Sequence, residues 1–311
     1  MAEYRLNTGY SIARTIDYAG DRDSFATALI DGLTYSARVS GSYSSGGSLA
    51  DPNLTLTDAS GRVLGFNDDI VNGVNRDARI TFTADRTATY NLIVGEQGNN
   101  ATGSYKLILT PGFATNANDN VGGTGYADAV NGMAGNDLLR GNGGNDMLYG
   151  GTGNDTLMGG NDQDRLIGDA GNDLLRGESG NDRLIGGDGG DRLIGGAGAD
   201  VFDFDFATDS DAGGVDVIAA GDGAPAFQGA GVSGGDVLDL SGIDANEYLG
   251  GNQAFQWSTS KATGTAYLAN VNGSTVLYAH TDNDGSIDFA VVIADGAGVS
   301  AQNYAGSDFI L

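Results

Sequence analysis

An aspartate recurs at every ninth residue over the middle third of the chain. The aspartates are Asp128, Asp137, Asp146, Asp155, Asp164, Asp173, Asp182, Asp191 and Asp200. An apolar residue follows each of them two positions later, as Val130, Leu139, Leu148, Leu157, Leu166, Leu175, Leu184, Leu193 and Phe202. Carboxylates repeated at a fixed interval are ligands for a hard cation, and calcium takes about six to eight oxygen ligands. The spacing therefore predicts a series of calcium sites.

Glycine dominates the segments between the aspartates, where the chain must turn tightly and glycine adopts positive φ without strain. In such turns the backbone carbonyls and the aspartate oxygens converge, so the loops offer only oxygen donors. The loop glycines that we expect to take part are Gly132, Gly135, Gly141, Gly144, Gly150, Gly153, Gly159, Gly168, Gly171, Gly177, Gly180, Gly186, Gly189, Gly195 and Gly198.

The apolar residue of each copy fits a short strand whose side chain points inward, with two copies forming one coil of a parallel roll. Aspartates of the same parity would then stack one coil apart, at roughly 4.8 Å. One predicted stack contains Asp128, Asp146, Asp164, Asp182 and Asp200, and the other contains Asp137, Asp155, Asp173 and Asp191. Ions between neighbouring loops would number at most four in the first stack and three in the second.

The most regular copy, GGTGNDTLM at residues 150–158, resembles the nonapeptide repeat of RTX proteins, G-G-x-G-x-D-x-U-x. That resemblance implies a β-roll with several bound Ca²⁺ ions. Two other interpretations are a flexible glycine-rich linker and a solenoid that needs no metal. Some copies depart from the pattern: Asp162 replaces a turn glycine, in a left-handed conformation that aspartate tolerates. The second glycine is replaced by Met133, Asn142, Asp169 and Glu178.

The composition limits the classes of partner that we expect the protein to bind. The 311-residue chain has 15 basic and 41 acidic residues, a net charge of −26. Residues 122–205 contain 5 basic and 15 acidic residues, and residues 206–311 contain 1 and 13. Nucleic-acid binding needs clustered lysine and arginine, so we expect no nucleic-acid partner and regard divalent cations as the natural counter-charge. No apolar stretch has the length of a transmembrane helix, so we expect no membrane span.

The residue types of most catalytic sites are scarce. The chain has no cysteine and a single histidine, His280. This composition excludes disulfides, cysteine nucleophiles and the H-E-x-x-H signature of zinc proteases. Any Ser-His-Asp triad would have to use His280, which lies in a strand-like pattern and fits a structural role. We therefore expect that the protein is not an enzyme.

Residues 10–110 show alternating apolar side chains and turn signals, which predict an antiparallel β-sandwich. The alternating sets are Tyr35, Ala37 and Val39; Leu54 and Leu56; Leu64 and Phe66; Ile80 and Phe82; Tyr90, Leu92 and Val94; and Tyr105, Leu107 and Leu109. The stretches GDRDSF (20–25), DPNLTLTDASGRVL (51–64), FNDD (66–69), RITFTA (79–84) and TYNLIVG (89–95) resemble the bacterial pre-peptidase C-terminal domain. The resemblance implies a non-catalytic module of secreted hydrolases, with relatives that bind collagen and calcium.

The N-terminal segment offers a second candidate metal site. Asp51 and Asn53 precede one strand of an apparent hairpin, and Asp68 and Asp69 follow the other strand. Antiparallel pairing would bring these ends together. The alternative is that all four are ordinary turn residues that bind backbone amides.

Residues 206–311 again predict strands, at 237–240, 266–271, 275–281 and 287–293, with a hairpin at Asp282-Asn-Asp-Gly285. The stretches GGAGADVFDF (195–204), GDVLDLSGIDAN (235–246), HTDNDGSIDFAVVI (280–293) and the final DFIL resemble the C-terminal domain of serralysin-type metalloproteases. In that family the region caps the roll and carries an uncleaved signal for type I secretion. The N-terminus lacks the apolar core of a signal peptide, which agrees with export by that route.

The predicted organisation is all-β, with a sandwich at 1–112, a linker at 113–121, a calcium-binding β-roll at 122–205 and a β cap at 206–311. We expect a secreted, non-catalytic calcium-binding protein with an N-terminal extracellular binding module, whose partners are calcium and a type I exporter. One alternative is an adhesin or matrix protein that recognises collagen-like protein or polysaccharide. The other is an accessory part of a secreted hydrolase.

Overall fold

The computed structural model describes residues 3–9, 11–41, 49–67, 77–96, 102–110, 112–211, 213–221, 225–227, 235–243, 253–258, 262–282, 286–294 and 304–311. Within these ranges the regular structure consists of strands and two short 3₁₀ turns, η1 (Ala207–Ser210) and η3 (Gly306–Asp308). The predicted all-β class is therefore confirmed. The chain forms two compact units, residues 1–114 with 126–131 and residues 115–125 with 132–311.

The first unit contains two sheets. One sheet has the strand order β1-β3-β8-β5-β6. Its strands are β1 (Glu3–Arg5), β3 (Asp23–Leu29), β8 (Ala88–Glu96), β5 (Pro52–Asp58) and β6 (Val63–Asn67). Strand β1, which lies before the residues 10–110 for which antiparallel strands were predicted, pairs in parallel with β3. The reason is that β2 (Ser11–Ile16), which joins the other sheet, separates β1 and β3 in the chain, so they are not a hairpin.

In the other sheet β4 (Thr34–Ser40) pairs with β9 (Gly103–Leu109), β7 (Ala78–Thr83) and β10 (Gly112–Phe113). Strand β2 pairs with β9, and β12 (Ala129–Asn131) pairs with β10. The alternating side chains predicted on β4, β5, β8 and β9 are buried, for example Tyr35, Leu54, Leu92 and Leu107. These side chains form the core of the first unit.

Strand β6 presents an exposed apolar face. Leu64 and Phe66 are exposed, at 38% and 58%, and Val63 is 61% exposed. Strand β6 is the last strand of its sheet and pairs only with β5 among the described strands. Alternation in the sequence shows that Leu64 and Phe66 share a face, but not that the face is covered.

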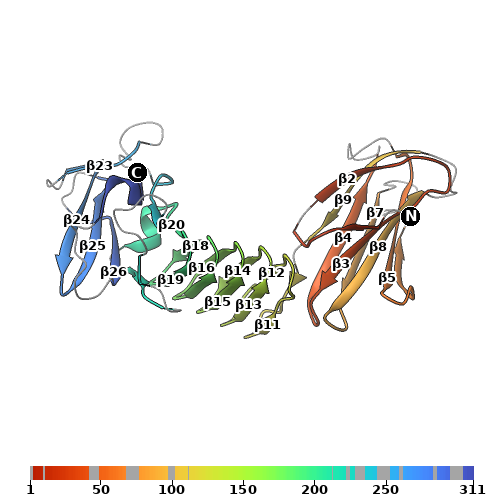
Figure 1. Cartoon of the computed structure of the whole chain (residues 1–311), viewed down its shortest axis with the longest axis horizontal. Helices are drawn as coiled ribbons and strands as arrows, with labels where there is room; N and C mark the ends of the chain where they lie inside the picture. Colours follow the sequence, from red (N-terminus) through yellow and green to blue (C-terminus); the bar gives the residue numbers. More distant parts are fainter. Residues whose placement is uncertain are drawn as a thin grey trace. The chain divides into compact units, whose positions relative to one another are not determined.

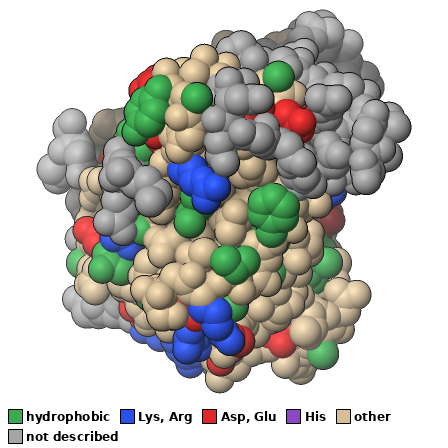
Figure 2. Space-filling model, turned by 90° about the vertical axis from the view of Figure 1, so that its right-hand side faces the viewer, with side chains coloured by type: hydrophobic (Ala, Val, Ile, Leu, Met, Phe, Trp, Pro, Cys, Tyr) green, Lys and Arg blue, Asp and Glu red, His purple; other side chains and the backbone are tan. Residues whose placement is uncertain are grey.

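On the face drawn in Figure 2, the described hydrophobic side chains lie as separate spots between polar surface. The basic side chains on this face gather in small groups and do not form a broad basic surface among the described residues.

The second unit contains the repeats, which form two rows of parallel strands stacked one coil apart (Figure 1). One row is β11 (Asn120–Gly122), β13 (Leu138–Gly143), β15 (Thr156–Asn161), β17 (Leu174–Ser179) and β19 (Arg192–Ala197). The other is β14 (Met147–Thr152), β16 (Arg165–Ala170), β18 (Arg183–Asp188) and β20 (Val201–Asp203). Leu139 pairs with Leu157, and Leu148 with Leu166, so each partner lies eighteen residues ahead. The prediction that two copies make one coil is confirmed.

The apolar residue of each copy fills the inside of the roll. Leu139, Leu148, Leu157, Leu166 and Leu175 are all 0% exposed. Because a coil of eighteen residues contributes only two such side chains, the roll has a thin apolar core.

The residues that depart from the glycine pattern have a left-handed backbone, which was predicted for Asp162 and is found at the other four as well. Five non-glycine residues in the repeats have φ between 70° and 76°, namely Met133, Asn142, Asp162, Asp169 and Glu178. Asparagine and aspartate tolerate this region best, so the methionine and glutamate positions carry the larger backbone strain.

Other loop glycines cannot be replaced. Gly153 has φ +126°, and a methyl group built on it would overlap the carbonyl oxygen of Gly135 one coil away. We expect Gly153→Ala to destabilise the calcium-loaded roll by at least about 2 kcal/mol, through strain and displacement of the neighbouring loop. Gly125→Ala is the matched control, because nothing lies within 4 Å of its added methyl group. Thermal unfolding in calcium measures both variants, and equal melting temperatures would contradict the prediction.

The cap continues both rows of the roll. Strand β21 (Asp216–Ala219) follows β19 and pairs in parallel with β26 (Phe289–Ala294). Antiparallel pairs then join β26 to β25 (Ser274–His280) and β25 to β24 (Thr265–Val271), and β23 (Gln256–Trp257) lies at the edge. In the other row, β22 (Val237–Asp239) follows β20 and pairs with β27 (Phe309–Ile310). The four strands predicted in this region are confirmed, although β26 begins at Phe289 and leaves Ile287 exposed.

Candidate metal centre: two aspartate ladders

The stacked aspartates are joined by hydrogen bonds that run along the roll. The backbone N–H of Asp137 donates to Oδ1 of Asp155 at 2.7 Å, and that of Asp155 donates to Asp173 at 2.7 Å. The same bond joins Asp173 to Asp191, Asp146 to Asp164, Asp164 to Asp182 and Asp182 to Asp200. Each carboxylate therefore orders the loop of the preceding coil through one of its oxygens. The predicted stacking by parity is confirmed for these residues; Asp128 lies in the first unit.

In eight aspartates of the second unit the second carboxylate oxygen has no hydrogen-bond partner in the protein. This unpartnered, buried Oδ2 occurs in Asp137, Asp155, Asp164, Asp173, Asp182, Asp191, Asp200 and Asp216. These residues are at most 4% exposed. A buried carboxylate oxygen without a donor is costly unless a cation or a proton neutralises it. The row of oxygens is therefore an arrangement that a cation would stabilise.

The first glycine of each loop leaves room beside that oxygen. A methyl group built on Gly150 would overlap Oδ2 of Asp155 and lie 2.7 Å from the carbonyl oxygen of Gly168. The same approach to an Oδ2 is made by Gly132, Gly141, Gly159, Gly168, Gly177, Gly186 and Gly195. At Gly132, Gly141, Gly150, Gly168 and Gly177 a carbonyl oxygen of the next coil also lies near this point. A carbonyl and a carboxylate oxygen together are the kind of donors that calcium prefers.

The third glycines of the loops have a different role. Gly135, Gly144, Gly153, Gly171, Gly180, Gly189 and Gly198 all have positive φ. They form the turns rather than the space beside Oδ2. Among the described residues no group of three or more acidic or histidine side chains converges, so each ion would be held mainly by one or two carboxylates together with backbone carbonyls.

The ladders are longer than the sequence analysis predicted. Asp119 donates its N–H to Asp137 Oδ1 at 2.7 Å, one coil before the first predicted member of that row. At the other end the N–H of Asp191 donates to Asp216 Oδ1 at 2.7 Å, and the N–H of Asp200 donates to Asp236 Oδ1 at 3.0 Å. Ser210 ends the row that contains Asp137 and Asp216, because its hydroxyl oxygen accepts a hydrogen bond from the N–H of Asp216.

Signals for the added members existed in the sequence. Asp119 lies nine residues before Asp128 and is followed two residues later by Val121. Gly214 and Asp216 keep the G-x-D spacing of the repeat, and Gly214 stacks on Gly189. Asp216 and Asp236 were missed because segments of 25 and 36 residues, instead of 18, separate the last repeat aspartates from them. Asp119 keeps the period of nine and was assigned to the linker instead.

A second ladder of asparagines runs beside the aspartates. Asn136 Oδ1 accepts from the N–H of Asn154 at 3.0 Å, and Asn154 Oδ1 accepts from Asn172 at 2.9 Å. Asn118, Asn172 and Asn181 accept equivalent bonds. The asparagine before each aspartate therefore satisfies a loop amide in the next coil, a role that the repeat pattern alone does not reveal.

Burial changes the proton affinity of the ladder in the ion-free chain. Desolvation raises the pKa of Asp164, Asp173 and Asp182 to about 7, although the backbone hydrogen bond to each opposes the shift. The pKa of Asp191 and Asp200 rises to about 6, and that of Asp216 to about 9, for the same reason. Neighbouring ladder carboxylates add to the rise for Asp173 and Asp216.

These shifts predict that acid partly replaces calcium. Because the folded pKa of about 7 for Asp173 exceeds the unfolded value of 3.8, the folded roll binds protons more tightly than the unfolded chain. The ion-free roll should therefore gain stability as pH falls from about 7 toward 4, and lose it as pH rises through about 7. Circular dichroism in calcium-free buffer at pH 8 and pH 5 measures the change. A β signal that stays constant with pH, or that rises equally in high salt at pH 8, would contradict the prediction.

The predicted N-terminal calcium site is only partly described. Asp51 precedes β5 and Asn53 lies within it. Leu54 pairs with Asn67, which places the start of β5 opposite the end of β6 and confirms the hairpin. Asp68 and Asp69 lie outside the described residues, so this site stays a prediction.

Comparison with known proteins supports the interpretation of the ladders. The family described as RTX calcium-binding nonapeptide repeat (4 copies) matches residues 122–157, 158–193 and 176–210. The chain contains RTX repeats. The matched residues are those that form the stacked coils and their buried aspartates, and proteins with RTX repeats are generally secreted. No curated protein sequence matches the chain.

The similarities to solved structures are distant. The pre-peptidase C-terminal domain of a Bacillus anthracis collagenase is 18% identical, with a TM-score of 0.28, over 35% of this chain and 95% of that one. A subunit of the mannuronan C5-epimerase from Azotobacter vinelandii is 22% identical, with a TM-score of 0.27, over 63% of this chain and 80% of that one. The periplasmic lysozyme inhibitor PliG of Aeromonas hydrophila is 12% identical, with a TM-score of 0.24, over 35% of this chain and all of that one. At these scores none of them supports an argument about function.

Proposed function

We propose that the chain is a secreted, non-catalytic calcium-binding protein whose RTX repeats fold when they bind calcium outside the cell. The observation that carries the proposal is the row of buried Oδ2 atoms without a partner, such as those of Asp155 and Asp173. A methyl group built on the glycine beside each of these two oxygens would meet both the Oδ2 atom and a carbonyl oxygen of the next coil. Such oxygens are suited to calcium. No basic side chain among the described residues donates a hydrogen bond to them.

Different atoms of the chain have different roles in each proposed ion site. Oδ1 of each aspartate orders the preceding loop by accepting its N–H, while Oδ2 is left for the ion. The glycine beside Oδ2 keeps the space open, and the neighbouring carbonyl oxygen completes the donor set. When bound, calcium supplies the positive charge that offsets the repulsion between two neighbouring loops and cross-links them. Its binding free energy therefore becomes folding free energy.

Export by a type I system is the second part of the proposal. Its support is the resemblance of residues 195–204, 235–246 and 280–293 and the last four residues to the serralysin-type C-terminal domain. The test expresses the full chain and a chain that ends at Gly250 in a host with a type I exporter. Only the full chain should reach the medium. A chain without residues 3–112 is the control that should still be exported, and equal secretion of all three would overturn this part.

The absence of catalysis is also a proposal. Its support is the lack of cysteine and the single histidine, whose ring is 1% exposed and stacks on Tyr267 at 6.0 Å. Assays of the calcium-loaded chain on generic peptide and glycan substrates test it. Turnover that disappears on mutation of a single residue would overturn it.

One observation favours the adhesin alternative. Val63, Leu64 and Phe66 are exposed on β6, the edge strand of the first sheet. An exposed apolar edge strand is an unusual feature unless it pairs with or packs against another chain. Collagen-like peptides and polysaccharides offered to the full chain and to Phe66→Ser would show whether this strand takes part in binding.

A further inference from the structure

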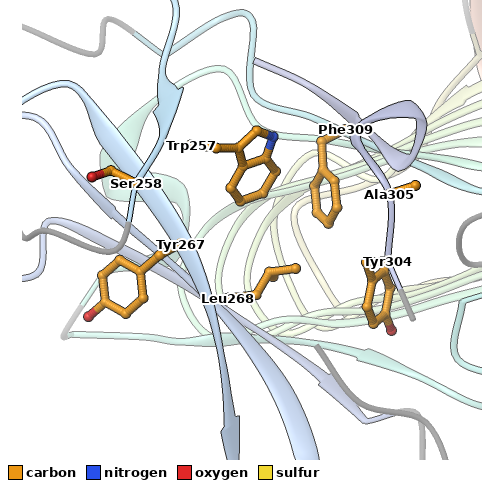
Figure 3. A pocket seen from close by; sticks show the side chains of 7 residues that line it. All are labelled: Trp257, Ser258, Tyr267, Leu268, Tyr304, Ala305 and Phe309. Carbon is orange, nitrogen blue, oxygen red and sulfur yellow. The ribbon is translucent and has the colours of Figure 1, made fainter. Parts of the chain in front are cut away.

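A pocket of about 650 Å³ lies in the cap, far along the chain from the repeats. Trp257 of β23, Leu268 of β24 and two residues of the C-terminal segment, Tyr304 and Phe309, provide its side-chain walls. Figure 3 shows these four side chains around a common space, whereas Ser258 and Tyr267 project from the other face of their strands. Pockets of this size that are lined by aromatic side chains are typical of small-ligand sites.

The rings meet at steep angles. The centroids of Trp257 and Phe309 are 4.9 Å apart with an interplanar angle of 79°. Those of Tyr304 and Phe309 are 6.0 Å apart at 51°. These are edge-to-face and tilted contacts, so the three rings form an angled wall and not a flat platform. An angled aromatic wall, which we call the cage, suits a compact, roughly spherical group that touches several rings at once, whereas a flat ligand stacks best on an open face.

The charges around the pocket select the sign of the ligand. None of the described residues that line it is charged. The C-terminal residues 206–311, to which all the described lining residues belong, include 1 basic and 13 acidic residues and therefore have a net charge of −12. That field repels anions and attracts cations. Calcium or a primary ammonium would find no carboxylate in the described lining, so neither would recover the oxygen ligands or hydrogen bonds that it loses on leaving water.

We propose that this pocket binds a quaternary ammonium group. Such a cation has no hydrogen-bond donor to satisfy, and its spread charge is attracted by the faces of aromatic rings. Trp257, Tyr304 and Phe309 supply three rings around one space, and the acidic cap supplies the long-range attraction. The site is separate from the aspartate ladders and needs no residue of the repeats.

The only tryptophan of the chain provides the readout, because Trp257 lines the pocket and is 42% exposed. Choline titrated into the full calcium-loaded chain should change tryptophan fluorescence in a saturable way, with a dissociation constant in about the millimolar range. The matched ligand is 3,3-dimethylbutanol, which has the shape of choline without its charge. It should bind at least about fivefold more weakly. Glucose is titrated in the same way as an uncharged sugar. An equal response to choline and 3,3-dimethylbutanol, a response to glucose alone, or no response to choline would each overturn the proposal.

Two variants of Tyr304 separate the ring from its hydroxyl. Tyr304→Phe keeps the aromatic face and should retain choline binding within about twofold. Tyr304→Leu removes the face and should weaken binding by at least about fivefold. Unchanged melting temperature in calcium shows that each variant is folded, and Tyr304→Leu with wild-type affinity would overturn the cage. If Tyr304→Leu does not fold, Trp257→Leu followed by calorimetric choline titration serves the same purpose.

A second experiment distinguishes a free quaternary ammonium ligand from one carried by a lipid. Vesicles of phosphatidylcholine and vesicles of phosphatidylglycerol are sedimented with the calcium-loaded chain. Cosedimentation with phosphatidylcholine, reduced by Tyr304→Leu and by free choline, assigns the site to a lipid headgroup. Choline binding in solution without cosedimentation assigns it to a soluble ligand. Cosedimentation that Tyr304→Leu leaves unchanged overturns the lipid assignment.

Discussion

Removal of calcium from the full chain is expected to unfold the roll and to leave the N-terminal unit folded. Residues 122–205 carry a net charge of −10, and their ladder aspartates are at most 4% exposed. Two charges about 5 Å apart repel by about 1 kcal/mol in water and about 3 kcal/mol at an effective dielectric of 20. Against this repulsion stands one inward apolar side chain in every nine residues, and the loops are rich in glycine, which loses much entropy on ordering.

Hydrogen exchange with mass spectrometry is the measurement. In about 5 mM calcium the amides of β13 to β19 should be protected, and in chelator they should exchange at rates close to those of an unfolded chain. Peptides from β3 and β8 are the internal control, because their sheet contains none of the ladder aspartates. Protection of the roll that survives in chelator at pH 7.5 would mean that burial alone stabilises it. The metal-free solenoid would then be the correct interpretation.

The strict part of the repeat was predictable because its determinants are local and periodic. The interval of nine predicted the inward leucines, and the glycine pattern predicted the left-handed backbone at Asp162. Each of these follows from the spacing within a single copy. The register between coils needed one more premise, because shifts of nine and of eighteen residues both superimpose the aspartates and the leucines. The register of eighteen follows from the expectation that two copies form one coil.

The ends of the ladders depend on contacts that no period reveals. Asp216 and Asp236 occupy ladder positions only because the chain returns to the roll after insertions of different length. The aspartates of the cap were too common in sequence for any one to stand out. In the N-terminal unit, likewise, alternation placed Leu64 and Phe66 on one face of β6, but the position of β6 at the sheet edge decides that this face is exposed.

Substitution of one interior ladder residue should separate the two functions of its carboxylate. In Asp173→Asn the amide oxygen can still accept the N–H of Asp155, which now donates to Oδ1 at 2.7 Å. The other oxygen, which has no partner in the protein, becomes an NH₂ group that cannot bind a cation. We expect the calcium midpoint for folding to rise at least about tenfold, because a buried ligand and its charge are lost.

Asp173→Ala should be worse than Asp173→Asn in calcium, by about 1 to 3 kcal/mol, because it also leaves the buried amide of Asp155 without an acceptor. Asp188→Asn is the matched control: it removes the same charge from an exposed position of the roll and should leave the midpoint within about twofold. Calcium titrations followed by circular dichroism measure all three.

The effect of Asp173→Asn on folding without calcium distinguishes an ion ligand from a structural hydrogen-bond acceptor. There the carboxylate of Asp173 is buried beside Asp155 and Asp191, and its pKa is raised to about 7. At pH 8 Asp173→Asn replaces this unfavourable charge by a neutral amide, so the ion-free roll should become no less stable than the parent, while its calcium affinity falls. A variant that weakens folding equally with and without calcium would show that Asp173 acts as a structural hydrogen-bond acceptor alone. Opposite effects in the two conditions can arise only if the unpartnered oxygen is an ion ligand whose burial opposes folding until the ion binds.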